Sequence, residues 1–588
     1  MKNRCKVLAV AIAVAFCVVD SQAQVSTRNK PRLVPGEIVV KYKSDTPQAT
    51  AMTSLESAGV ANIRTSPNIP FMVGKVAPGK KVEDVLNACR ALPNVEYAEP
   101  NYRVYALETP QNSPVMPNDP RFEELWNLHQ ADDRDIDAPE AWAITKGSRD
   151  VIVGVIDTGI DYDHEDLKAN IWHNPGESGD KATNKIDDDG NGYADDFRGW
   201  NFVFKNKDPY DNHGHGTHVA GTIGAVGDNK KGVAGVNWQV KLMALKFLDS
   251  NGEGTTADAA AAIIYATNNG ARVLNNSWGG DEFSQALQEA IEHAHDRGVL
   301  FIAAAGNDGL NTDRSPRYPS TYEVPNVIAV GSSDRSDKLS GFSNFGRRTV
   351  DLVAPGSNIL SAQPLSRYQI LSGTSMAAPH VSGVCALIWA KYPNLKPHQV
   401  IIRLLGAVDR KPEFINCISS GGRLNAAQAL ATKPLIANTT DWRNTANTAG
   451  PYPVSTAVIA VDSLTSIRLI YNLNGTLADS MEMAAGPNDT YSAGIPGQPL
   501  NTTIEYAVSA TDNAGNRTAS PTYVFKTTSE SDPRDKVGCC GQCAVTITGL
   551  DGAARLAAQI PINVAFFLLP IMLLRRKNRN ANFVDERE

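Results

Sequence analysis

The chain has 588 residues, which is too long for one ordinary hydrophobic core and predicts several domains. Its hydrophobic share of 42% and charged share of 20% are typical of a globular protein and exclude a largely disordered one. The formal net charge of −7 argues against a nucleic-acid-binding surface, so we expect no nucleic acid partner.

Residues 1–23 have the pattern of a secretory signal peptide. Lys2 and Lys6 precede an apolar run that ends near Val19, and the small residues that follow form a cleavage signal. We therefore expect export, to the medium or to the cell surface. Eight cysteines are too few for a disulfide-dense scaffold. A bridge between Cys385 and Cys417 and a packed, free Cys385 thiol both stay open.

A small α+β unit is predicted over residues 32–107. The runs EIVVKY, FMVGKV and VEYAEP predict strands, and Val85, Leu86 and Cys89 line one face of a predicted helix. A proline-rich, turn-rich stretch follows this unit. It is expected to be a linker open to cleavage.

A large α/β domain is predicted over residues 116–432. Short apolar runs such as VIVGVI, KLMALKF and LFIAAA alternate with helical patterns at Thr256–Asn269 and Ser284–Arg297. This alternation predicts a parallel sheet flanked by helices on both faces. Functional sites in such sheets gather at the carboxyl ends of the strands.

Strand-length segments without helical patterns predict a β-sandwich module over residues 435–528. In TIEYAVSA, for example, Ile504, Tyr506 and Val508 share one face. Residues 529–588 are expected to hold a linker, a cysteine cluster (Cys539, Cys540 and Cys543) and an apolar segment at about 556–574 with a basic tail. That segment is just long enough to span a bilayer, and an interfacial or packed helix is the alternative.

Asp157 ends the run VIVGVI and precedes a glycine turn, so a carboxylate is expected at the carboxyl end of a strand. A turn-capping aspartate has the same pattern. An aspartic protease would need two such carboxylates sharing one proton, and the Asp-Thr-Gly motif occurs only once in the sequence.

Three histidines, His213, His215 and His218, lie in a glycine-rich segment at the start of a predicted helix. They suit a zinc site, which needs three or four ligands at short spacing. They equally suit a serine hydrolase, in which one imidazole accepts the proton of the nucleophile while a carboxylate holds its tautomer. This segment alone leaves both open.

Ser375 lies at the start of another apolar helix, among small residues. In that position its own N–H and the positive end of the helix face a developing oxyanion. An ordinary N-cap serine is the alternative.

Taken together, VIDTGID, HGTHVAGT and GTSMAAPH resemble the signatures of the subtilisin family in sequence, order and spacing. The order Asp157, His215, Ser375 is also the order in which the triad of subtilisin runs along the chain. The resemblance covers roughly residues 36–430. It implies a serine endopeptidase that acts on proteins or peptides, with Asp157 orienting His215 as the base for Ser375.

The resemblance also implies a substrate site and a maturation step. Asn307 would donate its side chain to the oxyanion. An extended peptide would bind along a backbone edge formed by Ser277, Trp278 and Gly279. The first unit resembles the inhibitory propeptide of the family, with a ferredoxin-like fold, so we expect a zymogen inhibited by its own propeptide. The β-sandwich resembles immunoglobulin-like or fibronectin-type modules, and the tail resembles bacterial sorting signals that retain a protein at the membrane.

Calcium is the cofactor that the resemblance implies. The acidic run NKIDDDGNGYADD has the first half of an EF-hand-like oxygen cage, although no glutamate closes it because Arg198 stands at the twelfth position. A solvated acidic turn is the alternative. The expected ligands are Asp187, Asp189, Asn191, Tyr193, Asp195 and Asp196, with Asp166 and Asp228 at a second place.

A catalytically silent, surface-anchored binding protein is the alternative function. The presence of all three triad residues argues against it.

Overall fold

The computed structural model describes residues 33–43, 46–65, 71–102, 114–530 and 532. The chain divides into two units, Met1–Ser113 and Pro114–Glu588. The predicted signal peptide, the cluster of Cys539, Cys540 and Cys543, and the apolar segment at 556–574 lie outside the described residues. Within the residues that are described, no helix has the length and hydropathy that a membrane crossing needs.

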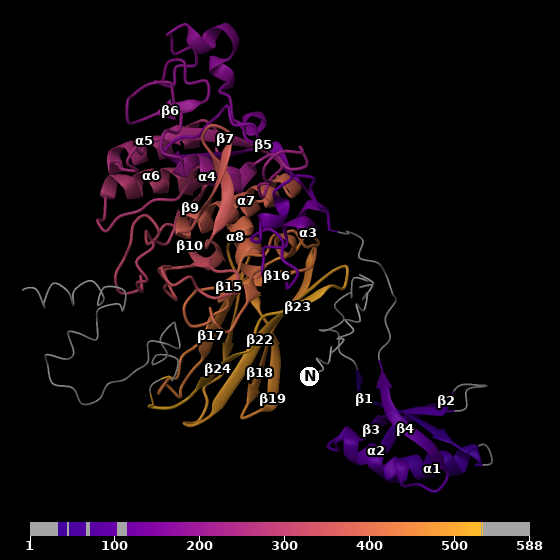
Figure 1. Cartoon of the computed structure of the whole chain (residues 1–588). Helices are drawn as coiled ribbons and strands as arrows, with labels where there is room; N and C mark the ends of the chain where they lie inside the picture. The colour runs from indigo at the N-terminus through magenta and orange to yellow at the C-terminus, as the bar shows by residue number, and fades with distance from the viewer. Residues whose placement is uncertain (1–32, 44–45, 66–70, 103–113, 531, 533–588) are drawn as a thin grey trace, which may run out of the picture. The chain divides into compact units, whose positions relative to one another are not determined.

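The N-terminal unit is a four-stranded antiparallel sheet with two helices (Figure 1). Its elements are β1 (Leu33–Tyr42), α1 (Gln48–Ala58), β2 (Val60–Thr65), β3 (Phe71–Val76), α2 (Val82–Arg90) and β4 (Val95–Tyr102). The sheet order β2-β3-β1-β4 and the βαββαβ succession are ferredoxin-like, as predicted. Val85, Leu86 and Cys89 of α2 are buried because they recur on one helix face. The sequence patterns did not single out α1 or β2.

A nine-stranded sheet forms the centre of the second unit, with the order β14-β15-β11-β10-β9-β8-β5-β7-β6. All neighbours pair parallel except β14 and β15. The strands are β5 (Gly147–Asp157), β6 (Gly199–Asn201), β7 (Gln239–Lys246), β8 (Val273–Asn276), β9 (Leu300–Ala304), β10 (Val327–Ser333), β11 (Leu352–Pro355), β14 (Asp409–Arg410) and β15 (Gly422–Arg423). The predicted parallel sheet is therefore confirmed.

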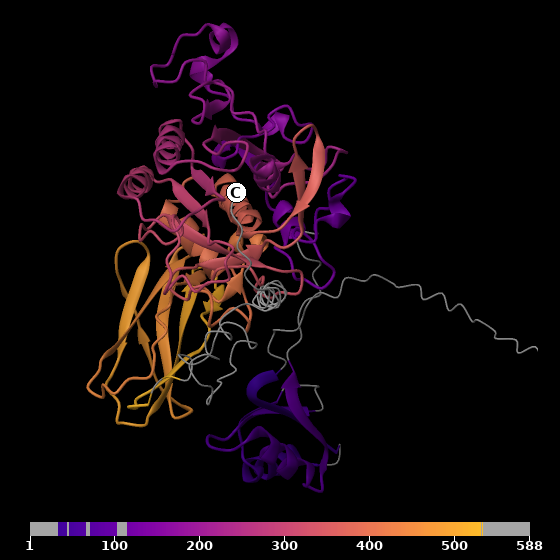
Figure 2. The same ribbon diagram turned by 60° about the vertical axis from the view of Figure 1, so that its left-hand side comes forward.

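Helices cover both faces of this sheet (Figures 1 and 2). One hydrophobic cluster includes α4 and α7, and a second includes α5 and α6, which lie side by side. The helices are α3 (Ala138–Trp142), α4 (His215–Gly224), α5 (Thr256–Asn268), α6 (Gln285–Asp296), α7 (Thr374–Lys391), α8 (Pro397–Gly406) and α9 (Ala426–Ala429). The two helices predicted from periodicity are α5 and α6, to within one residue at each end.

Three antiparallel arrangements complete the unit. β12 (Ile359–Gln363) and β13 (Arg367–Leu371) form a hairpin. Beyond residue 434 two sheets have the orders β16-β17-β21-β20 and β19-β18-β22-β23, with β24 also paired to β22. Their strands are β16 (Leu435–Ala437), β17 (Tyr452–Ile459), β18 (Leu464–Leu473), β19 (Thr476–Glu482), β20 (Ala484–Ala485), β21 (Thr490–Ile495), β22 (Thr503–Asp512), β23 (Arg517–Ala519) and β24 (Tyr523–Lys526).

The two C-terminal sheets share one hydrophobic core. Ile504, Tyr506 and Val508 are buried in it, as the alternation in β22 predicts. An immunoglobulin-like or fibronectin-like sandwich stays a prediction.

The question of a bridge between Cys385 and Cys417 has a clear answer. Cys385 and Cys89 are free, buried thiols, whereas Cys417 is disulfide-bonded. Cys385 is therefore a packed side chain of α7, and it does not pair with Cys417.

Candidate active site

Three strands of the large sheet end at one place. Asp157 is the last residue of β5, Ser277 directly follows β8, and Asn307 follows β9 by three residues. Because β9, β8 and β5 are parallel neighbours, their carboxyl ends share one edge of the sheet. Two helices begin at the same edge, α4 at His215 and α7 at Thr374, so the sheet and the helices bring five distant segments together.

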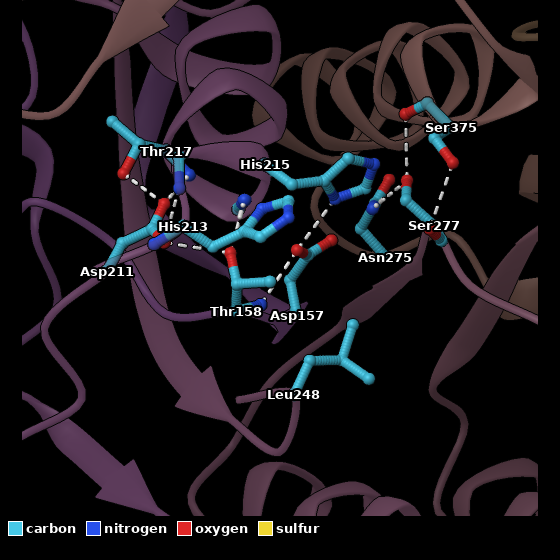
Figure 3. Close-up of polar contacts among 12 residues, drawn as sticks. Asp157, Thr158, Asp211, His213, His215, Thr217, Leu248, Asn275, Ser277 and Ser375 are labelled. Atoms are coloured by element: carbon cyan, nitrogen blue, oxygen red, sulfur yellow. Dashed lines mark hydrogen bonds and ion pairs between the residues drawn. The ribbon is translucent and has the colours of Figure 1, made fainter. Parts of the chain in front are cut away.

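His215 and Asp157 form the central pair of the site (Figure 3). The imidazole Nδ1 lies 2.8 Å from Asp157 Oδ1, which also accepts the N–H of Thr158 at 2.7 Å. Asp157 is fully buried, whereas the His215 side chain is 22% exposed. Burial lowers the pKa of His215, but the Asp157 carboxylate and, more weakly, Asp211 outweigh it and hold that pKa above its ordinary value. A carboxylate thus fixes the ring and favours its protonated form.

Asp211 is a buried carboxylate that the sequence analysis missed. Its Oδ1 accepts the hydroxyl of Thr158 and the N–H groups of His213 and Gly214, and its Oδ2 accepts the N–H and hydroxyl of Thr217. These bonds tie the residue after Asp157 to the first turn of α4, on the side of the site opposite Ser375 (Figure 3). Asp211 therefore helps to set the position of His215.

The hydroxyl of Ser375 donates to the carbonyl oxygen of Ser277 at 2.9 Å rather than to the imidazole. In return, the hydroxyl of Ser277 donates to the carbonyl oxygen of Ser375, also at 2.9 Å. Figure 3 shows the ring of His215 between Asp157 and Ser375. Rotation of the Ser375 side chain about its Cα–Cβ bond to another rotamer would turn its oxygen away from Ser277.

Two hydrogen-bond donors lie around a small space beside Ser375. A β-carbon built at Gly373 would lie 3.5 Å from Asn307 Nδ2 and 3.6 Å from the backbone nitrogen of Ser375. Asn307 is oriented by its Oδ1, which accepts the N–H and hydroxyl of Thr374 at 2.8 and 3.0 Å, so its amide N–H groups are free to face that space. Ser375 N–H belongs to the first turn of α7, where backbone donors have no partner within the helix.

The predicted substrate edge follows β8 directly. Gly279 is exposed, and a β-carbon there would come within 2.8 Å of the Tyr318 carbonyl oxygen, so the chain has no room for a side chain at this point. Trp278 packs its ring against Phe247, with ring centroids 4.8 Å apart. The predicted substrate edge is therefore fixed by the packing of Trp278 against Phe247 and by the close contact of Gly279 with Tyr318.

The three histidines do not converge on a cation site. His218 is buried, and its Nε2 lies 3.0 and 3.1 Å from the carbonyl oxygens of Ile359 and Gln369. His213 is exposed, with its ring 6.3 Å from that of His215. Across the described ranges, the group of three potential ligands close enough to share an ion contains no histidine.

That group consists of Glu177, Asp189 and Asp196, whose nearest carboxylate oxygens all lie within 4.8 Å of one another. Glu177 and Asp196 are fully buried, and Glu177 Oε2 has no hydrogen-bond partner among the described residues. Burial, and then the neighbouring carboxylates, raise the pKa of Glu177, and burial likewise raises that of Asp196. Three close carboxylates with an unpartnered buried oxygen suit a hard cation.

The other predicted ligands of the acidic loop have different surroundings. Asp187 accepts the N–H groups of Asn191 and Gly192, which shape the turn. Asn191 reaches Asp196 Oδ2 at 2.8 Å through its side-chain nitrogen. Asp195 pairs with Lys207 at 2.8 Å, and Tyr193 packs its ring against that of Tyr265. Glu177 was missed because it lies outside the acidic run.

Asp166 and Asp119 are two further buried carboxylates that lie close enough to interact. Asp166 accepts bonds from Asn229 Nδ2 and Val233 N–H, and Asp119 Oδ2 accepts Asp228 N–H. Asp228 thus contributes its backbone, and its side chain is exposed. Asp119 Oδ1 is buried and has no partner among the described residues, and burial, with a contribution from Asp166, raises the pKa of Asp119 to about 6.

Comparison with known proteins gives two matches to protein families. Residues 148–429 match the Peptidase_S8, or Subtilase, family, and residues 20–101 match the Fervidolysin N-terminal prodomain. The Thermophilic serine proteinase of Bacillus sp. (strain AK1) is 37% identical over 380 residues, which are 64% of this chain and 84% of that protein. Thermitase of Thermoactinomyces vulgaris is 39% identical over 272 residues, 46% of this chain and 85% of that protein. Subtilisin DY of Bacillus licheniformis is 40% identical over 255 residues, 43% of this chain and 82% of that protein.

Proposed function

Because the chain belongs to the subtilase family of serine proteases and carries an N-terminal prodomain, we propose that it is an exported, calcium-stabilised endopeptidase with Asp157, His215 and Ser375 as its catalytic triad. One observation carries this proposal. The Asp157–His215 pair lies at the sheet edge where Ser375 N–H and Asn307 Nδ2 face a common space. A peptide carbonyl at that position would meet a nucleophile, a base and two donors.

In the proposed reaction, Ser375 Oγ attacks the peptide carbonyl carbon while its proton passes to His215 Nε2. The carbonyl oxygen becomes an oxyanion, which accepts hydrogen bonds from Ser375 N–H and Asn307 Nδ2. His215 then gives its proton to the leaving amine, and the peptide bond breaks to leave an acyl-enzyme. Water attacks the acyl carbon and loses a proton to His215, and Ser375 Oγ leaves with that proton.

Binding of the substrate backbone would release the Ser375 hydroxyl from its hydrogen bond to Ser277. Its hydroxyl donates to Ser277 carbonyl oxygen, an acceptor at the start of the proposed peptide-binding edge of Ser277, Trp278 and Gly279. A peptide N–H that binds this carbonyl competes with the hydroxyl. We infer that substrate binding itself favours the rotamer of Ser375 that faces His215.

Replacing Asn307 with alanine is expected to lower kcat by about 10²–10³-fold with little change in KM, because the lost donor acts only on the oxyanion. This size is the one known for the corresponding donor of subtilisin, a member of the same family. Thr374→Val, which removes one of the two donors that orient Asn307, is the matched control and should lose less than about tenfold. Equal losses of kcat and of substrate binding in Asn307→Ala would contradict this role.

We propose that calcium binds at the cluster of Glu177, Asp189 and Asp196, and also at the buried pair of Asp119 and Asp166. Unpartnered buried oxygens at Glu177 and Asp119 fit a cation that takes several carboxylate ligands. Neither cluster includes a residue of the proposed triad. When bound, calcium would neutralise the carboxylates and stabilise these loops.

Glu177→Gln tests the first of these sites. With calcium about 100-fold above its Kd, chelation should lower the Tm of the wild-type protein by about 5 °C more than it lowers that of the variant, because one ion is already lost from the variant. Asp195→Asn is the control, since Asp195 pairs with Lys207 instead of joining the cluster. An equal response to chelator in wild type and Glu177→Gln, measured by calorimetry, would remove calcium from this cluster.

We further propose that the chain is exported as a zymogen and releases its own prodomain. A charged and then apolar amino terminus, a ferredoxin-like prodomain and the proline-rich stretch before residue 117 support this. The test is amino-terminal sequencing of the secreted product from wild-type and Ser375→Ala precursors. The mature enzyme should begin near residue 117 in the wild type, while the variant keeps its prodomain. A variant processed like the wild type would show that another protease cuts it.

A further inference from the structure

Lys246 is a lysine with almost no exposure, at the carboxyl end of β7. Its relative exposure is 1%, and in the strand register it lies beside Asp157. Lysine is almost never fully buried unless it is paired, because a charge is costly to remove from water. No carboxylate in the described ranges forms an ion pair with this side chain, so something other than a direct pair holds it there.

Three oxygen acceptors surround the ammonium group. Lys246 Nζ donates to the carbonyl oxygens of Thr158 at 2.6 Å and Leu248 at 2.9 Å, and to Asn212 Oδ1 at 3.1 Å. A neutral amine has only two N–H donors, whereas the ammonium has three. The three bonds therefore fit the charged form.

These bonds join the segments that carry the proposed acid–base pair. Thr158 directly follows Asp157, and Asn212 precedes His215 by three residues. The N–H of Leu248 in turn donates to the carbonyl oxygen of Asp157 at 3.2 Å. One side chain thus links the carboxyl ends of β5 and β7 to the loop that leads into α4.

The ammonium also faces several charged groups. Asp157 and Asp211 are fully buried near it, and Asp208 and Asp249 lie in the more exposed loops on either side. Burial lowers the pKa of Lys246, and these four carboxylates oppose the effect. Asp157 and Asp211 also face the imidazole of His215, so the same two carboxylates act on both cations. The other titratable groups beside that imidazole are His213, whose ring centroid lies 6.3 Å away, and the buried His218.

We propose that Lys246 is a positioning residue of the active site, whose buried ammonium holds the Asp157 and His215 segments together and limits how strongly Asp157 and Asp211 favour the protonated imidazole. The inference rests on the proposed function, since it takes His215 as the base of the reaction. Lys246 acts through these neighbours and touches no substrate.

The sign of the expected effect follows from the role of the base. His215 must be neutral to accept a proton, so kcat/KM rises as pH passes upward through its pKa. Asp157 and Asp211 hold that pKa above the ordinary value of about 6.5, so the acid limb of the wild-type profile should lie above about pH 6.5. Loss of the positive charge that faces Asp157 and Asp211 leaves these two carboxylates to favour the imidazolium further. The limb should therefore move upward by about half a pH unit or more.

The test compares pH profiles of kcat/KM for mature wild-type, Lys246→Met and Lys241→Met enzymes. Lys241 lies on the same strand, away from the triad, so Lys241→Met is a matched control with an unshifted limb. Lys246→Gln replaces Lys246→Met if the latter does not fold, because glutamine keeps a hydrogen-bond donor and loses the charge. Circular dichroism and melting curves establish folding before each profile is measured.

An upward shift confined to the neutral Lys246 variant supports the inference. An active Lys246 variant with the wild-type acid limb overturns it and leaves the proposed function intact. Failure of both neutral variants to fold also overturns it, because the ammonium would then be a requirement of folding alone. Absence of Ser375-dependent hydrolysis in wild type and Lys241→Met would instead overturn the proposed function.

Discussion

Replacing Ser375 with alanine is expected to lower kcat by roughly 10⁶-fold, the loss known for the nucleophile of subtilisin, which belongs to this family. The physical reason is the loss of the hydroxyl that, in the proposed reaction, attacks a carbonyl bound beside Ser375 N–H and Asn307 Nδ2. Substrate binding should be nearly unchanged, since the backbone donors and acceptors of the binding edge remain. Single-turnover kinetics on a chromogenic peptide measure both quantities.

Ser372→Ala is the matched control for this prediction. Ser372 lies three residues before Ser375, and its exposed hydroxyl accepts Asn358 N–H at 2.8 Å. Its loss should change kcat by less than about twofold, because a surface substitution of this kind leaves the site intact. Hydrolysis by Ser375→Ala at the rate of the control would assign the nucleophile to another residue.

Asp157→Asn is expected to lower kcat by about 10⁴-fold near neutral pH with little loss of stability. Asp157 Oδ1 accepts the protons of both His215 Nδ1 and Thr158 N–H. Asparagine keeps the shape but has no charge, and its amide favours the imidazole tautomer in which Nε2 carries the proton and cannot accept one from Ser375. His215 therefore stays in place but can no longer act as the base.

The control for this substitution is Asp163→Asn, at an exposed position six residues further along the chain. It should be nearly neutral for both kcat and Tm. A fall of less than tenfold in Asp157→Asn, with Tm unchanged, would show that this carboxylate does not hold the tautomer of His215.

Sequence patterns predict those parts of the fold in which the order of apolar and polar residues matches the burial that the fold imposes. The buried strands read as apolar runs because both sheet faces are covered, and α5 and α6 have clear periodicity. The run VIVGVI predicts a strand that ends in Asp157, and Asp157 is the last residue of β5. Short β2 and weakly amphipathic α1 lack such a signal, because their burial depends on the rest of the small sheet.

Supporting residues of the site are harder to predict, because their partners are distant in the sequence. Asp211 and Glu177 lie in polar stretches of the sequence that carry no signal of burial, yet both are fully buried in the fold. Lys246 carried the one usable signal, a charge inside the apolar run KLMALKF. The Ser375 rotamer has no sequence signal at all, since it depends on the carbonyl of Ser277.

The proposed mechanism depends on the activation of Ser375 as a nucleophile by His215 and Asp157. Mass spectrometry of the mature enzyme treated with an organophosphonate tests it most directly, because the reagent labels only an activated serine. We expect one adduct, on the peptide that contains Ser375. No adduct should form on enzyme that is denatured before treatment, and much less should form on Asp157→Asn. An active enzyme that gains no adduct, or gains it on a different residue, would show that Ser375 is not the activated nucleophile.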